Sequence, residues 1–226
     1  MKPKPSFLDL VSIKMRQILF PGSGEFWESR YSLGGNSGGG SYGRLAEFKA
    51  EVINRFVKDK NVASVIEFGC GDGNQLTLAK FPQYAGLDVS TTAISLCREK
   101  FDRDGTKSFF LYSPFCFLDR QGIFKADLGL SLDVIYHLVE DEIFHTYMNH
   151  LFSASEKFVI IYSSDEDRSG GPHARHVRHR NFSRWVGENL PGWSLLERVK
   201  NRYPGTGDLG QGSFADFFFF AKTARL

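Results

Sequence analysis

The sequence predicts an α/β fold with a seven-stranded, mostly parallel sheet and a helical extension at the N-terminus. From residue 44 onward, short apolar runs alternate with segments of helical periodicity, which is typical of parallel strands covered by helices on both faces. The last two strand-like runs have no helix between them, so we expect a terminal antiparallel hairpin. The expected organisation is an N-terminal helix and glycine-rich flap over residues 1–43, followed by one domain over residues 44–226.

The first 43 residues carry a helical pattern and then a cluster of glycines. Residues 6–20 place six apolar side chains on one helical face, so we expect a helix that packs on the domain; docking to a partner or a membrane surface is the alternative. Three charged residues interrupt this segment, which therefore lacks both a signal-peptide core and the roughly 20 apolar residues of a membrane span. Glycines cluster at 34–40, so residues 22–43 are expected to form a loop, either a plain linker or a flap over a ligand.

The elements of the domain follow in order. A helix that begins near Arg44, with apolar residues recurring every three or four positions up to Val57, precedes the first strand at 64–68. The other expected elements are strands at 84–88, 107–112, 127–132 and 158–163, helices at 90–101, 139–152 and 181–190, and hairpin strands at 193–200 and 213–223.

Composition limits the partners of the chain. Its 28 Lys and Arg and 26 Asp and Glu give a net charge of +2, which is too small for a general polyanion binder, so no general nucleic-acid binding is expected. Three cysteines without CxxC spacing argue against a disulfide framework or a cysteine zinc site. They indicate a reducing compartment, and we expect a cytoplasmic protein.

The most specific motif is VIEFGCGDGN, residues 65–74, in which a strand runs into three glycines spaced as GxGxG. Such a turn lets the backbone approach a ligand closely, and a following helix would direct its N-terminus at that ligand. The spacing differs from the GxGxxG dinucleotide motif and from a P-loop. Asp88 ends the next strand, 21 residues after Glu67, where a carboxylate can accept hydrogen bonds from both ribose hydroxyls. Two carboxylates beside the turn would repel a pyrophosphate and suit a cationic nucleoside.

These features resemble the class I S-adenosylmethionine-dependent methyltransferases over roughly residues 44–223, including their Rossmann-like sheet with a terminal hairpin. The resemblance implies S-adenosylmethionine as the cofactor, with the glycine loop holding its methionine part and Asp88 its ribose. A nicotinamide-binding sheet is the alternative, against which the glycine spacing and the hairpin argue. Residues 111–115 read LYSPF where many members carry an acidic or amide residue, so Ser113 or Phe115 would have to contact the adenine. The expected cofactor-binding residues are Glu67, Gly69, Cys70, Gly71, Gly73, Asp88, Val89, Ser113 and Asp133.

The strand at 127–132 ends in Asp133, Tyr136 and His137, at the edge of the sheet where ligands bind in this fold. The proline-rich motif of enzymes that methylate exocyclic base nitrogens is missing from this stretch. A histidine suits oxygen methylation, because imidazole can take the proton of an attacking hydroxyl near neutral pH. We therefore expect His137 to be the catalytic base and Asp133 to orient it or contact the methionine amine; a packed structural histidine is the alternative. A metal shared by Asp133 and Asp165 has no diagnostic spacing, and no metal is expected.

A basic stretch, PHARHVRHR, places three histidines and three arginines between Pro172 and Arg180. It contains no cysteine or carboxylate, which argues against a zinc site, and nucleic acid would usually require a broader basic face. Such side chains suit a phosphate, a carboxylate or a densely hydroxylated acceptor, although a solvated charged loop is the alternative. The expected acceptor-binding residues are Tyr136, His173, Arg175, His176, Arg178, His179 and Arg180.

The sequence as a whole predicts transfer of a methyl group from S-adenosylmethionine to the oxygen of a sugar, glycan or similar polar small molecule. N-methylation of a nucleic acid or a protein is an alternative enzymatic function. A second alternative is a non-catalytic cofactor-binding module that docks a partner through the basic stretch. The oligomeric state does not follow from the sequence.

Overall fold

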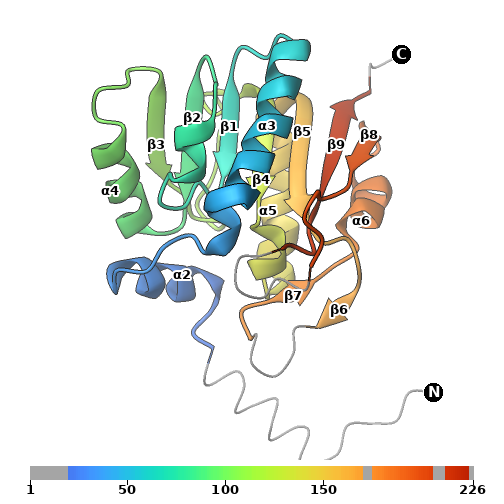
Figure 1. Cartoon of the computed structure of the whole chain (residues 1–226). Helices are drawn as coiled ribbons and strands as arrows, with labels where there is room; N and C mark the ends of the chain where they lie inside the picture. Colours follow the sequence, from blue (N-terminus) through green and yellow to red (C-terminus); the bar gives the residue numbers. More distant parts are fainter. Residues whose placement is uncertain (1–19, 170–174, 206–211, 224–226) are drawn as a thin grey trace, which may run out of the picture.

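The computed structural model describes residues 20–169, 175–205 and 212–223, so the helix expected at 6–20 lies outside the described residues except for its last residue. Seven strands form one sheet in the order β3-β2-β1-β4-β5-β9-β8 (Figure 1). These strands are β1 (Val65–Phe68), β2 (Tyr84–Asp88), β3 (Lys107–Leu111), β4 (Ala126–Leu132), β5 (Ser155–Ser163), β8 (Trp193–Val199) and β9 (Asp216–Lys222). The first five run parallel, while β9 is antiparallel to both β5 and β8, which confirms the predicted fold class and the terminal hairpin.

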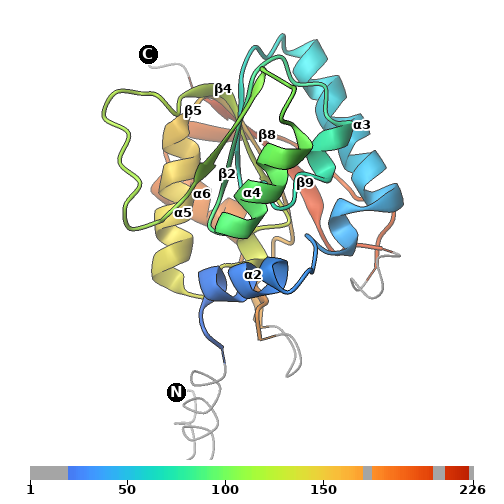
Figure 2. The same cartoon turned by 90° about the vertical axis from the view of Figure 1, so that its left-hand side faces the viewer.

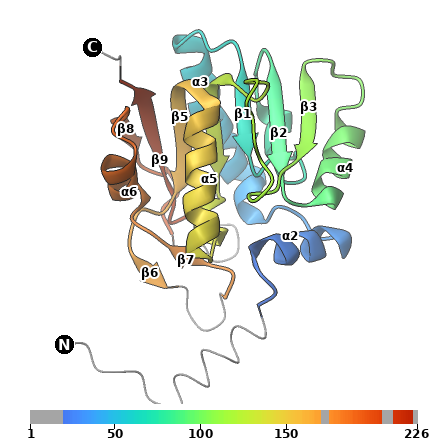
Figure 3. The same cartoon turned by 180° about the vertical axis from the view of Figure 1, so that it is seen from behind.

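Helices cover both faces of the sheet. They are α2 (Ser23–Ser32), α3 (Gly43–Asp59), α4 (Thr91–Lys100), α5 (Asp141–Ala154) and α6 (Phe182–Asn189). The side chains of α3 and α4 share one apolar core and those of α5 and α6 share the other; α3 lies in front of the sheet in Figure 1, and α5 lies in front when the molecule is seen from behind (Figure 3). No helix in the described ranges has both the length and the apolar character that a membrane crossing requires.

Strand β9 contributes to both cores because side chains alternate along a strand. Phe217 and Phe219 pack with α3 against one face of the sheet, whereas Phe218 and Phe220 pack with α5 and α6 on the other. All four phenylalanines are buried. The run DFFFFAK, residues 216–222, is therefore a central strand with two apolar faces.

Two local expectations differ from the structure. A helix, α2, forms inside the segment expected to be a loop, because the glycines cluster after it and because Ser23 at its start and Glu28 in its middle bond to the rest of the domain. The glycine motif is followed only by a four-residue 3-10 helix, η2 (Gln75–Leu78), where a helix directed at the ligand was expected. A ligand at the glycine loop therefore meets the backbone amides of the loop. No long helix follows the loop to direct its N-terminus at the ligand.

The order of the strands reverses direction at β1, whose neighbours are β2 on one side and β4 on the other. Ligands of such sheets bind in the crevice outside the carboxyl ends of the strands at this point. Here α2 lies across that end of the sheet, below α4 in the view of Figure 2. The fold thus forms a covered site at its switch point.

Candidate active site

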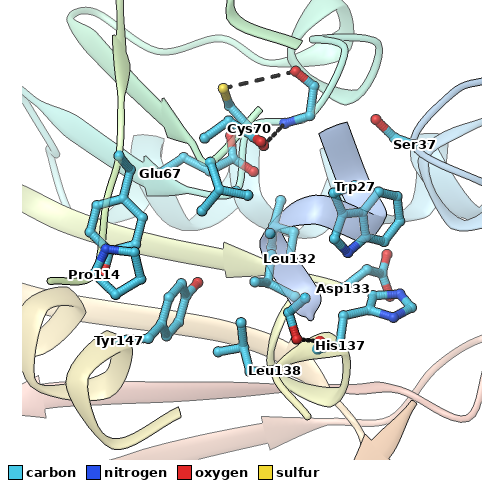
Figure 4. Close-up of a pocket in the computed structure, with 18 of the residues that line it drawn as sticks. Trp27, Ser37, Glu67, Cys70, Pro114, Leu132, Asp133, His137, Leu138 and Tyr147 are labelled. Atoms are coloured by element: carbon cyan, nitrogen blue, oxygen red, sulfur yellow. Dashed lines mark hydrogen bonds between the residues drawn. The ribbon is translucent and has the colours of Figure 1, made fainter. Parts of the chain in front are cut away.

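A cavity of about 370 Å³ lies at the carboxyl ends of β1, β2 and β4, beneath α2. Figure 4 shows Trp27, Asp133 and His137 grouped on one side of the cavity and Pro114 and Tyr147 on the other. Eight of the nine residues expected to bind a cofactor line it: Glu67, Gly69, Cys70, Gly71, Asp88, Val89, Ser113 and Asp133. The ninth, Gly73, faces α4, since a Cβ there would lie 3.0 Å from Sγ of Cys97.

The glycine loop forms the floor of the cavity with its backbone. Gly69 and Gly71 have φ angles of 88° and 57°, in the left-handed region that favours glycine. A Cβ on Gly69 would lie 2.5 Å from Cγ2 of Val134, and one on Gly71 would lie 2.3 Å from Oγ of Ser37. Side chains at these two positions would therefore push apart the loop and the elements packed on it.

Asp88 is fixed at the end of β2 by the glycine loop itself. Its Oδ2 accepts a hydrogen bond from the amide of Gly71 at 2.8 Å, and its Oδ1 accepts one from the amide of Ser90 at 2.9 Å. Each oxygen keeps a lone pair that can accept a further hydrogen bond from a ligand. Burial raises the pKa of Asp88 to about 6, against the opposing effect of the amide hydrogen bonds.

Glu67 is the second buried carboxylate of the cavity. The hydroxyl of Tyr84 donates to its Oε2 at 2.5 Å, and burial raises the pKa of Glu67 to about 7. A buried carboxylate with one neutral donor is costly to ionise, so a cationic ligand in the cavity would stabilise its charged form.

The far wall of the cavity comes from the segment after β3. Leu111, Tyr112, Ser113, Pro114 and Phe115 all line it. This wall is largely apolar, with the hydroxyl of Ser113 as a polar group, and it is the part of the cavity that could hold a flat aromatic base.

His137 lies on η3 (Ile135–His137), directly after β4, and its ring borders the cavity. Its Nδ1 lies 3.0 Å from the carbonyl oxygen of His176, and because a carbonyl only accepts, Nδ1 carries the proton. The Nε2 atom of the neutral ring then carries no proton and can accept one. Trp27 contacts the His137 ring edge-on at 4.9 Å, and His176 stacks on it at 5.3 Å. Burial lowers the pKa of His137 to about 4, so the ring is neutral at physiological pH.

Among the described residues, His137 is held by the carbonyl of His176 and makes no hydrogen bond to Asp133, so the first of the two expected roles of Asp133 is not supported. Contact of Asp133 with the methionine amine stays a prediction. Both carboxylate oxygens of Asp133 have other partners: Nζ of Lys49 lies 2.6 Å from Oδ2, and the hydroxyl of Tyr136 donates to Oδ1 at 2.8 Å. Tyr136 is buried and does not line the cavity, so it is placed to hold Asp133 and not an acceptor.

The sequence reasoning missed Lys49, although a signal was present. Lys49 falls on the apolar stripe of α3, four residues after Leu45 and three and four residues before Val52 and Ile53. A lysine on a core-facing stripe requires a buried partner.

The roof of the cavity comes from residues 22–43, for which the sequence left open a plain linker or a flap over a ligand, and the structure favours the flap. Trp27 and Tyr31 of α2 line the cavity, and Ser37 of the following segment lies against the glycine loop. The amide of Ser37 and the hydroxyl of Tyr42 both donate to Oδ2 of Asp72 in that loop, at 3.0 and 2.7 Å. The residues around the glycine cluster thus close over the site.

The basic stretch divides between two places. His176 stacks on Phe26 at 4.6 Å and on His137, at the edge of the cavity. Arg178 and Arg180 both pair with Asp141 and donate to the carbonyl of Val139, so their guanidinium groups brace the turn between His137 and α5.

The other members of the stretch lie away from the cavity. His179 is buried, and its Nδ1 bonds Oγ of Ser164 at 2.5 Å. Together with Arg178 and Arg180 it borders a separate polar depression beside α6. Arg175 is exposed, and His173 lies outside the described residues.

The described side chains do not bring Asp133 and Asp165 together. Asp165 accepts hydrogen bonds from the amide and hydroxyl of Ser183 at the start of α6. In the part of the chain that the structure describes, no three histidine, cysteine or acidic side chains are grouped closely enough to hold a metal ion.

Comparison with known proteins gives matches in sequence and in structure. A curated small RNA 2'-O-methyltransferase from Arabidopsis thaliana is 21% identical over 214 residues, which cover 80% of this chain and 23% of that protein. The chain thus spans about a quarter of the relative's length. The methyltransferase domain of bacterial CtHen1-C has 23% identity and a TM-score of 0.63, over 80% of this chain and all of the domain. Magnesium protoporphyrin IX methyltransferase from Synechocystis PCC 6803 with bound SAH has 16% identity and a TM-score of 0.58, over 78% of this chain and 83% of that one. No protein-family model matches the chain.

These matches correct the expected partners. A sugar or glycan acceptor without general nucleic-acid binding was expected, and this is wrong in view of a curated relative named for small RNA and a structural match to a Hen1 domain. The net charge of a whole chain is insensitive to a local binding surface, so it could not exclude a nucleic-acid acceptor.

Proposed function

We propose that this chain, which has the fold of the class I S-adenosylmethionine-dependent methyltransferases, binds S-adenosylmethionine in the cavity beneath α2 and transfers its methyl group to a hydroxyl of a nucleic acid. The observation that carries the proposal is the arrangement of Asp88, the glycine loop and His137 around one covered cavity. Relatives crystallised with SAM or SAH support the choice of cofactor.

The residues present fit this cofactor. Asp88 has two lone pairs free for a ribose diol, and the segment around Ser113 supplies an apolar wall for the adenine. The backbone of Gly69 and Gly71 gives the methionine part a close approach, with the Glu67 carboxylate nearby as a counter-charge. S-adenosylmethionine supplies an electrophilic methyl group on a sulfonium.

His137 would take the proton that an acceptor hydroxyl loses as it attacks the methyl carbon. The hydrogen bond to the His176 carbonyl leaves Nε2 as the accepting atom and fixes the orientation of the ring. Trp27 and other residues of α2 line the cavity from above and would limit the access of water to it. Much of the remaining rate enhancement would come from positioning, because the transfer itself discharges the sulfonium.

A nucleic-acid acceptor is favoured by the curated relative, whose name specifies a ribose hydroxyl of small RNA. An imidazole base is consistent with an oxygen acceptor, since a hydroxyl must be deprotonated during attack whereas many amines need no base. The cofactor-binding module without activity is the competing function, since it would use the same cavity.

A turnover assay tests the proposal. The chain is incubated with methyl-labelled S-adenosylmethionine and single-stranded RNA, the matching DNA without 2'-hydroxyls, or a protein mixture. We expect label to be incorporated into RNA and not into the matching DNA. Cofactor binding without methylation of any acceptor would support the non-catalytic module, and label in DNA or protein alone would refute the ribose acceptor.

A further inference from the structure

A fully buried lysine lies on α3 directly behind the wall of the cavity. Lys49 has a side-chain exposure of 0%, and its Nζ lies 2.6 Å from Oδ2 of Asp133 and 5.3 Å from the ring centre of Tyr162. Lysine is almost never fully buried without a partner, because removing the ammonium from water is costly. The position of this side chain therefore depends on the charge of Asp133.

Asp133 itself is held in an unusual conformation. It follows β4 with a φ of 61°, which is uncommon for a residue other than glycine, and 12% of its side chain is exposed where it lines the cavity. Gly40 of the roof packs against it, since a Cβ there would lie 2.8 Å from Oδ2. Lys49, Tyr136 and Gly40 thus fix one carboxylate from three different elements.

We propose that Lys49 is a positioning residue that cancels the charge of Asp133, so that this wall of the cavity does not favour a cationic sulfonium over a neutral thioether. The inference rests on the proposed function, since it concerns the cofactor of that site. Methyl transfer converts the sulfonium into a thioether, and a carboxylate left unpaired beside it would stabilise the reactant more than the transition state. Interactions that are stronger in the ground state do not accelerate a reaction.

The charge preference of the cavity can be measured without turnover. Calorimetry gives the dissociation constants of S-adenosylmethionine and S-adenosylhomocysteine for the wild type and for Lys49→Met. Loss of the ammonium should shift the ratio of the two constants by about tenfold toward the sulfonium ligand, because the Asp133 charge is then unopposed. The double variant Lys49→Met/Asp133→Asn should move the ratio most of the way back to the wild-type value; the remainder would come from Glu67, whose charge Lys49 also stabilises.

A matched control exists on the same strand. Lys157 pairs with Asp127 at 2.8 Å near the amino end of β4, away from the cavity. Lys157→Met removes an ammonium from this more exposed lysine–aspartate pair and should leave the ratio unchanged. Circular dichroism checks that each variant is folded. If Lys49→Met does not fold, Asp133→Asn alone provides the test: its unopposed ammonium should shift the ratio toward the neutral thioether.

Three results separate the possible failures. An unchanged ratio in a folded Lys49→Met that binds both ligands would overturn the inference, and so would a double variant that keeps the shift of the single one. If the wild type binds neither ligand, the proposed function fails and this inference fails with it.

Discussion

Two buried acids in one cavity give the protein without ligand an unusual response to pH. The pKa of Glu67 is raised from 4.5 to about 7, so its ionisation opposes folding as the pH rises through this range. A raised carboxylate pKa stabilises the folded state below about pH 4.5, and that stabilisation is lost on the way to pH 7.

We therefore expect Glu67→Gln to change the pH dependence of unfolding. This pKa shift corresponds to about 3 kcal/mol of unfolding free energy. As the pH rises from 4.5 to 8, the wild type should lose roughly this much stability relative to the variant, whose amide does not ionise. Urea unfolding at both pH values measures it. Asp104→Asn, in an exposed turn, is the control, and parallel pH profiles for wild type and Glu67→Gln would contradict the assignment.

The environment of His137 leads to a prediction about catalysis. If Nε2 of His137 takes the proton of the hydroxyl that is methylated, His137→Ala should lower turnover by roughly 10²–10⁴-fold with little change in cofactor affinity. Because its pKa is lowered to about 4, the acid limb of the wild-type rate profile should lie near pH 4 and not near 6.5. His145→Ala, on an exposed position of α5, is the matched control. An acid limb near pH 6.5 that persists in His137→Ala would identify another base.

At the scale of elements, α2 connects two parts of the site that are far apart in sequence. Near one end, Ser23 bonds Glu140 and the carbonyl of His137. Further along the helix, the carboxylate of Glu28 accepts hydrogen bonds from Ser90 and Thr92, which follow Asp88 at the end of β2. These hydrogen bonds, that of Ser90 first, lower the pKa of Glu28 to about 2.

Weakening this connection should make the cavity easier to open. Glu28→Ala removes the contacts with α4. We therefore expect S-adenosylhomocysteine to dissociate several-fold faster, because the lost free energy is on the order of that of one or two hydrogen bonds. Stopped-flow tryptophan fluorescence, to which Trp27 in the roof contributes, can follow the release. Glu25→Ala changes an exposed carboxylate of the same helix and should release the ligand at the wild-type rate. Equal rates for all three proteins would show that α2 does not limit release.

At the scale of the whole molecule, the predictable features were those encoded locally. The strands, the hairpin and the pairing of the glycine loop with Asp88 follow from short runs and fixed spacings, and the structure confirms the strands and the hairpin. Lys49 and Asp133 are 84 residues apart, and no local pattern connects them. The helix α2 depends on partners supplied by the rest of the fold. Arg178 and Arg180 looked like a free basic surface because their partners are a carboxylate and carbonyls elsewhere in the chain.

The place of β9 in the sheet has a consequence for biosynthesis. It lies between β5 and β8, yet it is translated after every other strand, and its four phenylalanines complete the packing on both faces. Until residue 222 has left the ribosome, β5 has no partner on this side of the sheet, and its unpaired edge can bind solvent, a chaperone or another chain. The nascent chain can collapse early, but it reaches its native state only after translation has passed this strand.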